Sequence, residues 1–341
     1  MSRALIVRRA GPGVTVQDLG RPGFMAYGLS RGGAADRRAM AEGAALLGQK
    51  RDLAAIEMAG FGGEFEVTGD IRVALTGAPM RATLDGADIR WNTSHILPAG
   101  SILNIGGATA GVYGYLHVAG GVETPERIGS RSAHLAARLG GSIDDGARLP
   151  VGQDPSQNVG LTLDVEPRFS GGEVRIVPSL QTEVFAPAER ERFTETIFTR
   201  DTRGNRMGVR LLPDGCGFAT DAGLNILSEV IVPGDIQITG DGTPYVLMTE
   251  SQTTGGYPRI GSVIPADLPR VAQAAPGTQL TFRFITLDEA VEIERKERAG
   301  IAELPRRVYP LIRDPHDIAD LLAYQLVGGV TAGDDLEPEG T

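Results

Sequence analysis

Two stretches of the sequence repeat the same order of short segments, and this repeat is the strongest constraint on the fold. Pro98 to Gly106 resembles Pro233 to Gly240, and each segment leads through an apolar run into a glycine pair. The pairs, Gly120-Gly121 and Gly255-Gly256, lie 135 residues apart. Several matches in one order favour duplication over chance likeness between glycine-rich turns, and so long a period predicts two similar domains rather than a solenoid.

The remaining strand signals are short and bracketed by turn residues. The chain has 47 glycines and 21 prolines among 341 residues, a mixture typical of many short strands joined by tight turns. Phe65 and Val67, then Ile71 to Leu75, alternate with polar residues on either side of Gly69-Asp70, which predicts a half-buried hairpin. The sequence therefore predicts a mainly β fold with a few helices.

Local signals predict two helices and the limits of the lobes. Asp36 is a suitable N-cap for a helix that runs to Leu47 and is followed by Gly48, and Thr286 forms a capping box with Glu289. We expect a first lobe over residues 1–160 and a second lobe over residues 165–300, which carries the loop that reads TTGGYP. Residues 301–341 are expected to form a helical appendage with an acidic tail.

The appendage contains an apolar pattern from Asp317 to Val327, with spacings of three and four that predict an amphipathic helix. This helix could pack on its own lobe or dock a partner, and both alternatives stay open. The acidic segment from Gly333 to Gly340 is typical of disorder.

Charge and composition exclude several classes of function. The formal net charge is -10, whereas nucleic-acid binding needs a concentrated basic face, so we expect no nucleic-acid partner. No run approaches the roughly 18 apolar residues of a membrane span, and the first residues lack a signal-peptide pattern. The single cysteine, Cys216, fits a reducing compartment, so we expect a cytoplasmic protein without a membrane partner.

Nucleophilic and metal chemistry have little support in the sequence. Ser30 and Ser251 lack the GxSxG setting, Cys216 lies in a predicted turn, and none of the four histidines has a recognisable neighbour. No HxxxH, HxH or CxxC spacing places two ligands on one ion, so we expect no metal site. Lys50 and Lys296 are the only lysines, and neither lies in a phosphate-binding GxxxxGK sequence.

The polar loop from Gln252 to Pro258 is the strongest candidate for a ligand site. It follows an apolar strand pattern, and the glycines Gly255 and Gly256 let its backbone approach a ligand closely. Consecutive amides of such a loop can point at a carbonyl or anionic oxygen. The side chains that add donors or a ring wall are those of Gln252, Thr253, Thr254 and Tyr257. The alternative is a plain β-turn whose glycines supply a positive φ.

Further polar clusters contain candidate binding residues. Gln17, Asp18 and Arg21 lie close in sequence, and the simplest alternative is an ion pair between Asp18 and Arg21. Arg206 lies in a glycine-flanked basic loop that suits a carboxylate or a phosphate, although a solvated basic loop has the same pattern. Asp267 lies at a predicted helix start, where its alternative role is that of a cap.

These residues resemble one family, the second subunit of allophanate hydrolase and its relatives. The relatives include the C subunit of 5-oxoprolinase, the antagonist (KipA) of a sporulation-kinase inhibitor, and a carboxyltransferase segment of biotin-dependent urea carboxylase. The motifs spread over residues 4–285, so the resemblance covers most of the chain. They are Thr15 to Gly23, Gly33 to Asp36, Tyr115 to Gly121, Gly129 to Ser132, Arg206 to Leu211, Thr253 to Pro258, and Ala266 to Leu268 with Gln273.

The resemblance implies two cyclophilin-like β-barrel lobes and a role within an ATP-dependent 5-oxoprolinase, which opens the 5-oxoproline lactam to glutamate. It also implies two partners, a smaller KipI-like protein (the B subunit) and a LamB/YcsF-like protein (the A subunit), and ATP with magnesium at the level of the complex. Two alternatives stay open. One is a carboxyltransferase component of a biotin-dependent urea or allophanate amidolyase, with biotin on another chain. The other is a non-catalytic regulator that binds a kinase inhibitor.

The matching motifs also imply the site residues. The catalytic positions are Asp18, Asn205 and Glu250. The substrate-binding positions are Gln17, Arg21, Asp36, Arg131, Arg206, Gln252, Thr253, Thr254, Gly255, Gly256, Tyr257, Asp267 and Gln273. The chain departs from the family where Asn205 replaces an aspartate before Arg-Met-Gly and where Glu250 replaces an aspartate before the loop. An amide cannot act as a general base, so Asn205 cannot take that role.

Overall fold

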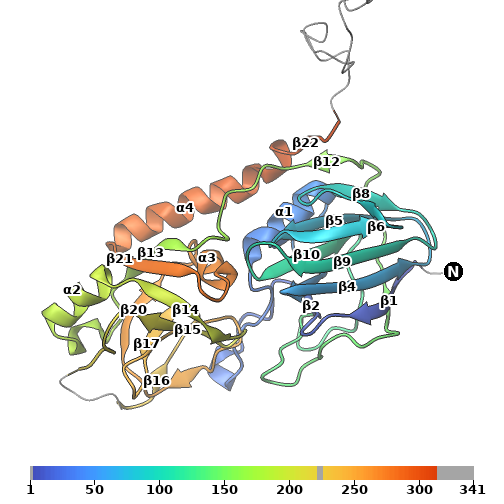
Figure 1. Ribbon diagram of the computed structural model, residues 1–341. Coiled ribbons are helices and arrows are strands. Elements are labelled where there is room, and N and C mark those ends of the chain that lie inside the picture. Colours follow the sequence, from blue (N-terminus) through green and yellow to red (C-terminus); the bar gives the residue numbers. More distant parts are fainter. Residues whose placement is uncertain (1–2, 221–225, 313–341) are drawn as a thin grey trace, which may run out of the picture.

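The computed structural model describes residues 3–220 and 226–312, which form two β-rich lobes (Figure 1). The first lobe contains strands β1 to β11 with helix α1, and the second contains strands β13 to β21 with helices α2 and α3. A long helix, α4 (Leu287–Glu303), runs from the second lobe towards the first (Figure 1). The predicted mainly β, two-lobed fold is confirmed.

The first lobe consists of two sheets that enclose one apolar core. Phe65, Val73 and Leu116 come from both sheets and are fully buried in that core. The six-stranded sheet has the order β11-β1-β4-β9-β6-β7, formed by β11 (Arg148–Pro150), β1 (Ala4–Ala10), β4 (Phe61–Val67), β9 (Ile102–Ala108), β6 (Met80–Leu84) and β7 (Ala87–Asp88). The five-stranded sheet has the order β2-β3-β10-β5-β8, formed by β2 (Thr15–Gln17), β3 (Ala55–Ala59), β10 (Tyr113–Val118), β5 (Ile71–Gly77) and β8 (Ser94–Leu97).

Helix α1 (Arg37–Leu47) begins and ends as its sequence predicts. The Asp36 carboxylate accepts hydrogen bonds from the N–H groups of Arg38 and Ala39, and Gly48 ends the helix in the left-handed conformation. The helix packs on β5 and β10 so closely that a Cβ at Gly43 would lie 2.2 Å from the His117 ring. Glycine is therefore required at this contact.

The predicted hairpin across Gly69-Asp70 is wrong. β4 pairs with β1 and β9, whereas β5 pairs with β10 and β8, so the chain crosses between the two sheets at this turn. Every residue of β5 is buried, because one side of the strand faces the core and the other lies under α1. The strand therefore has no solvent-facing side, which the alternating pattern had suggested.

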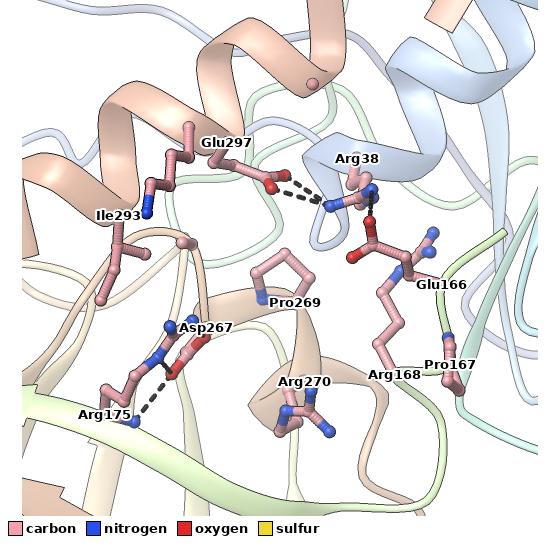
Figure 2. A pocket seen from close by; sticks show the side chains of 13 residues that line it. Arg38, Glu166, Pro167, Arg168, Arg175, Asp267, Pro269, Arg270, Ile293 and Glu297 are labelled. Carbon is pink, nitrogen blue, oxygen red and sulfur yellow. Dashed lines mark hydrogen bonds and ion pairs between the residues drawn. The ribbon is translucent and has the colours of Figure 1, made fainter. Parts of the chain in front are cut away.

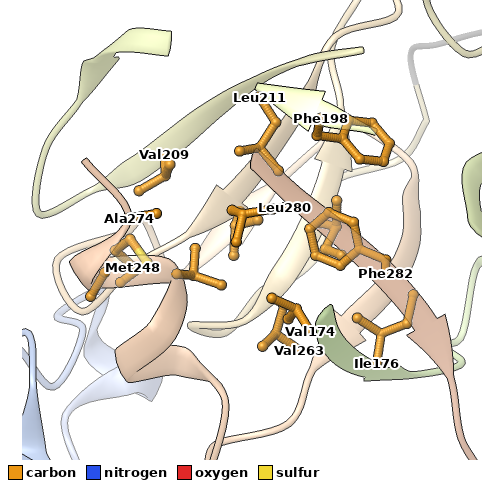
Figure 3. Packing of buried hydrophobic residues seen from close by; sticks show 14 of the residues in the cluster. Val174, Ile176, Phe198, Val209, Leu211, Met248, Val263, Ala274, Leu280 and Phe282 are labelled. Atoms are coloured by element: carbon orange, nitrogen blue, oxygen red, sulfur yellow. The ribbon is translucent and has the colours of Figure 1, made fainter. Parts of the chain in front are cut away.

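The second lobe is a closed seven-stranded barrel. Phe193 contacts Phe198 and Phe282 with ring centroids 4.9 and 5.2 Å apart. Figure 3 shows Phe198 and Phe282 close together on one side of the core. The barrel has the order β13-β20-β17-β18-β15-β14-β21, formed by β13 (Gly172–Val177), β20 (Arg259–Val263), β17 (Asp235–Ile238), β18 (Pro244–Leu247), β15 (Gly208–Pro213), β14 (Phe198–Gly204) and β21 (Gln279–Phe284).

Short elements complete the two lobes. Strand β16 (Glu229–Val230) pairs with β19 (Thr254–Gly255), and β12 (Leu161–Thr162) pairs with β22 (Tyr309–Pro310). The remaining helices are α2 (Pro187–Glu195), α3 (Leu268–Gln273) and the 3-10 turns η1 (Met25–Tyr27), η2 (Thr182–Val184) and η3 (Leu304–Arg306).

Helix α4 connects the lobes. It starts with the predicted capping box, in which Thr286 and Glu289 bond each other's backbone N–H groups. Further along, Glu297 forms an ion pair of 2.8 Å with Arg38 of α1. Leu304, just after the helix, is buried in one apolar cluster with Leu46. The end of α4 is thus anchored on the first lobe.

The structure leaves part of the predicted organisation untested. The internal duplication and the exact limits of the lobes stay predictions. The predicted helix from Asp317 to Val327 and the acidic tail lie outside the described residues. Among residues 3–220 and 226–312, no helix is long and apolar enough to cross a membrane.

Candidate functional site

The loop that reads TTGGYP borders a cavity of about 390 Å³ in the second lobe. The cavity lies between this loop, strands β17 and β18, and the turn that joins β14 to β15. Its polar lining includes Asn205, Gln237, Ser251, Gln252 and Tyr257. Three of the predicted site residues, Asn205, Gln252 and Tyr257, therefore share one cavity.

Close packing positions the loop. The Ile231 N–H donates to the Thr253 carbonyl at 3.0 Å, and the Ile226 N–H donates to the Gly256 carbonyl at 2.9 Å. A Cβ at Gly255 would lie 2.5 Å from Gln237 Nε2, and one at Gly256 would lie 3.0 Å from the Ile226 carbonyl oxygen. Neither glycine has a positive φ. Close approach, rather than the left-handed conformation of a plain turn, therefore requires glycine here.

Several polar groups around this cavity are unpaired. Within the part of the chain that the structure describes, the N–H groups of Gly256 and Tyr257 donate to no acceptor. Gln237 Nε2 and Ser251 Oγ are buried and also have no hydrogen-bond partner. Buried polar groups without partners are costly, and the N–H groups of the half-buried Gly256 and the exposed Tyr257 are open to a ligand, so this concentration favours a site that a polar ligand completes.

Asn205 forms the turn beside the cavity. Its Oδ1 accepts hydrogen bonds from the N–H groups of Met207 at 2.8 Å and Gly208 at 3.4 Å. This is the local turn chemistry that asparagine shares with aspartate. The residue lines the cavity and is exposed, but its carbonyl oxygen is occupied by the turn.

Arg206 points away from the cavity into the contact between the lobes. Its Nε donates to Glu250 at 2.5 Å, its Nη1 pairs with Glu57 of β3, and its Nη2 donates to the Gly33 carbonyl at 2.5 Å. Burial lowers the pKa of Arg206, but the two carboxylates outweigh it and hold the pKa above its ordinary value. Arg206 is therefore paired inside the protein with two carboxylates.

Glu57 was not expected to belong to the site. Its second oxygen accepts hydrogen bonds from Tyr115 Oη at 2.7 Å and from the Ala35 N–H at 2.8 Å. The residue lies 149 positions before Arg206, so no local pattern connects them. The one signal in the sequence is a loose likeness between Ile56-Glu57 and Ser228-Glu229, which extends the repeat.

Glu250 lies beside a serine and a histidine of the first lobe. Ser30 Oγ is 2.9 Å from His134 Nε2, and His134 Nδ1 is 3.8 Å from Glu250 Oε2. The Ala137 N–H donates to Nδ1 at 3.2 Å, so the ring proton is on Nε2 and points at Ser30. Burial lowers the pKa of His134 and favours this neutral ring. A histidine that donates to serine cannot take its proton, so these residues do not form a catalytic triad.

Asp18 fixes a loop of the first lobe. Its carboxylate accepts hydrogen bonds from Ser130 Oγ at 2.6 Å, from Ser132 Oγ, and from the N–H groups of Arg131 and Gly20 at 2.7 Å. No ion pair joins Asp18 to Arg21 among the described residues, so the alternative of a direct pair is wrong, although the charge of Asp18 partly offsets the burial that lowers the pKa of Arg21. The segment 130–132 supplies donors that are closer to the carboxylate.

The neighbours of Asp18 are also held by the first lobe. Arg21 Nη2 donates to the Ser132 carbonyl at 2.5 Å, and Gln17 Nε2 donates to Thr15 Oγ1 at 3.0 Å. Arg131 is 3.4 Å from Glu126. Asp18 and Arg131 line a separate cavity of about 360 Å³ that shares no lining residue with the loop cavity.

Asp36 and Gln273 connect the lobes. Gln273 Nε2 donates to Asp36 Oδ2 and to the Tyr113 carbonyl, and Gln273 Oε1 accepts from the N–H groups of Val112 and Tyr113, all at 2.9 Å. Arg168 also donates to Asp36 at 2.7 Å. Gln273 and Asp36 are fully buried, and their bonds hold elements of the two lobes together.

Asp267 lies at a third cavity, between α1, α3 and α4 (Figure 2). Its carboxylate does not cap the helix but accepts three hydrogen bonds from Arg175, two of them from the guanidinium at 2.8 and 2.5 Å. In the same cavity Arg38 pairs with Glu297 and Glu166 (Figure 2). Asp267 thus occupies the N-cap position of α3, but the alternative role of a side-chain cap is wrong, because Arg175 is a stronger partner than the helix N–H groups.

The predicted site residues thus fall into four places. The loop cavity has Asn205, Gln252 and Tyr257 in its lining and Gly255 and Gly256 in its bordering loop, where Thr253 is buried and Thr254 exposed. Arg206 and Glu250 lie between the lobes. The group around Asp18 belongs to the first lobe, and Asp36, Gln273 and Asp267 hold elements together. The functional roles of all these residues stay predictions.

Comparison with known proteins places the chain among carboxyltransferase-type proteins. The family model described as "Carboxyltransferase domain, subdomain A and B" matches residues 27–284. The C subunit of the Escherichia coli 5-oxoprolinase is 33% identical over 311 residues, which cover 89% of this chain and 99% of that protein. The Haemophilus influenzae protein of the same name is 32% identical over 298 residues, covering 86% and 95%. The resemblance drawn from the motifs is confirmed.

Solved structures of similar proteins are longer than this chain. The structure named TTHA0988 is 30% identical with a TM-score of 0.77, and the match covers 83% of this chain and 56% of that one. The chain therefore spans a little over half of that protein. The Kluyveromyces lactis urea carboxylase is 23% identical with a TM-score of 0.78, covering 92% of this chain and 31% of that one, which shows a shared fold.

Proposed function

Since the chain belongs to the family of the carboxyltransferase domain, subdomains A and B, we propose that it is one component of a 5-oxoprolinase that opens the lactam of 5-oxoproline with ATP. The support is its identity of 32 to 33% with two 5-oxoprolinase C subunits over nearly their whole length. Within that complex, the loop cavity binds the lactam.

One observation carries the chemistry of this proposal. The unpaired N–H groups of Gly256 and Tyr257 lie in the loop that borders the cavity. Two such donors can stabilise the negative charge that develops on the lactam oxygen when its carbonyl carbon is attacked or when the oxygen is phosphorylated. Gln237 and Ser251 also line the cavity, and Gln237 Nε2 and Ser251 Oγ are buried polar atoms without partners.

The cavity lacks a group that could remove a proton from water. Its described lining contains no carboxylate and no histidine. Glu250, the nearest predicted base in sequence, is 2% exposed and bonded to Arg206. General-base catalysis needs a group within hydrogen-bond reach of the attacking atom. This arrangement supports a complex in which the KipI-like and LamB/YcsF-like partners supply the base and the site for ATP with magnesium.

A second function has a specific observation in its favour. The urea amidolyase of Saccharomyces cerevisiae is 25% identical over 326 residues, which cover 88% of this chain but 18% of that protein. A carboxyltransferase role would use the same donors on the oxygen of an amide, with biotin carried by another chain. The two roles differ in their second substrate, and this difference can be measured.

The test is reconstitution with a KipI-like and a LamB/YcsF-like partner. We expect 5-oxoproline-dependent release of ADP and glutamate when all three chains are present, and none when this chain is omitted. If the complete complex releases no ADP with 5-oxoproline, the proposal is wrong. Carboxylation of urea or a related amide in the presence of a biotin carboxylase and a biotin carrier would support the alternative instead. If neither activity is detected and the protein binds a kinase inhibitor tightly, the protein is a regulator.

A further inference from the structure

A cavity of about 270 Å³ lies between the lobes and shares no lining residue with the loop cavity. The first lobe contributes Arg31 and Arg37, and the second contributes Met248, Thr249 and Leu268. Both lobes must therefore be in place for the cavity to exist. Neither the motifs nor the proposed function assigns it a role.

The two arginines of this cavity form no ion pair among the described residues, and the one carboxylate whose charge acts on them is Asp18, which raises the pKa of Arg31 against the larger effect of burial. Arg31 Nε donates to the Leu19 carbonyl at 2.9 Å, whereas the side chain of Arg37 forms no hydrogen bond within residues 3–220 and 226–312. Burial lowers the pKa of Arg37 to about 10, and the like charge of Arg31 acts in the same direction. Both side chains stay cationic near pH 7, so the cavity holds two neighbouring positive charges.

Other arginines between the lobes are neutralised. Arg168 pairs with Asp36 and Glu42, each at 2.7 Å, and Arg206 pairs with Glu57 and Glu250. The arrangement at these two arginines is thus two carboxylates for each guanidinium, and Arg38 has three. Arg31 and Arg37 lack such carboxylate contacts, which indicates that an anion from outside the chain binds them.

The walls of the cavity define the rest of the ligand. Met248 and Leu268 are apolar, and Pro269 continues the same surface. Thr249 Oγ1 is buried and has no hydrogen-bond partner, so the lining also contains one neutral polar group that a ligand could pair. Inorganic phosphate carries oxygens on every side and would lose part of its water shell against these apolar walls, whereas a ring carboxylate has its charge at one end only.

We propose that this cavity is a binding site for a small carboxylate with an apolar body, held by Arg31 and Arg37 against Met248 and Leu268. A volume of about 270 Å³ accommodates a ligand the size of a five-membered ring with one carboxylate. The inference does not depend on the proposed function, because the two cavities are separate. It gives the contact between the lobes a ligand-dependent stability.

Calorimetric titration of the full chain tests the site with cyclopentanecarboxylate as the probe. We expect saturable binding of cyclopentanecarboxylate, at least tenfold weaker binding of its neutral isostere cyclopentanecarboxamide, and similarly weak binding of acetate and inorganic phosphate. Equal binding of the carboxylate and the amide would overturn the role of the arginines. Tighter binding of phosphate than of the ring acid would overturn the choice of ligand.

Variants supply the second half of the test. Arg37→Leu should weaken binding of cyclopentanecarboxylate at least tenfold and should raise the melting temperature of the ligand-free protein, because it removes an unpaired charge from a half-buried position. The exposed Arg298, on α4, provides the matched control Arg298→Leu, which should change neither quantity. Arg31→Gln serves as an independent variant if Arg37→Leu does not fold. Unchanged binding in a folded variant of either arginine contradicts the proposal.

Discussion

Replacing Arg206 with methionine should strongly destabilise the contact between the lobes. Methionine fills much of the same volume but removes the charge that neutralises Glu57 and Glu250, which are 1% and 2% exposed. It also leaves the Gly33 carbonyl without its donor. Two buried carboxylates would then lie close together without a counter-ion.

The size of the effect follows from that geometry. Removing one member of a buried ion pair costs about 3–5 kcal/mol, because the remaining charge is left uncompensated. If the lobes unfold together, an unfolding entropy of roughly 2.1 cal/mol/K per residue over about 300 residues converts this cost into a drop of roughly 5–8 °C in melting temperature. Urea denaturation followed by circular dichroism measures the free energy, and calorimetry measures the melting temperature.

Two further variants separate charge from packing. Arg203→Met is the matched control, since Arg203 is exposed and pairs with Asp201 at the surface, and it should cost less than about 1 kcal/mol. The triple variant Glu57→Gln, Arg206→Met, Glu250→Gln should be more stable than Arg206→Met alone, because the unpaired charges are removed together. If the free energy of unfolding of Arg206→Met lies within about 1 kcal/mol of the wild-type value, the reasoning about a buried counter-ion is refuted.

Two more predictions concern buried polar groups. Gln273→Ala should lower the free energy of unfolding by about 3 kcal/mol, because it leaves the N–H groups of Val112 and Tyr113 without acceptors. The control is Gln279→Ala on the exposed side of β21, which should change that free energy very little in the same urea denaturation. Burial lowers the pKa of His117 to about 3, so below pH 6.5 the unfolded chain binds a proton at this residue and the folded chain does not. The free energy of unfolding should therefore fall as the pH drops from about 6.5 towards 3. At pH 5 the loss should be about 2 kcal/mol. His117→Gln should remove this decline between pH 7 and pH 5, and an unchanged decline would show that other groups cause it.

Local chemistry made part of the fold predictable. Asp36 and the pair Thr286 and Glu289 start their helices as expected, because a cap depends on residues three or four positions apart. The hairpin across Gly69-Asp70 failed because strand pairing depends on the whole lobe. Alternation over a few residues cannot show that α1 covers the second side of β5.

The site was predictable only where it is continuous in sequence. The loop from Gln252 to Tyr257 lines or borders a single cavity. Arg206 gave the pattern of a free anion-binding residue because its counter-ion Glu57 lies 149 positions away. Asp36 and Gln273 lie 237 positions apart and bond each other across the lobes, so their shared structural role could not be read from spacing.

The central claim is that the amides of the loop act on the lactam oxygen, and turnover by the reconstituted complex with Gly256→Val tests it most directly. A Cβ at this position would lie 3.0 Å from the Ile226 carbonyl oxygen, so valine must displace the loop and turn its N–H groups. Loss of an oxyanion donor typically lowers kcat by about 10²–10³-fold. Gly141→Val is the control, since nothing lies within 4 Å of its Cβ position. We expect kcat for 5-oxoproline to fall about 100-fold or more in a folded Gly256→Val complex, and retention of wild-type kcat would contradict the account.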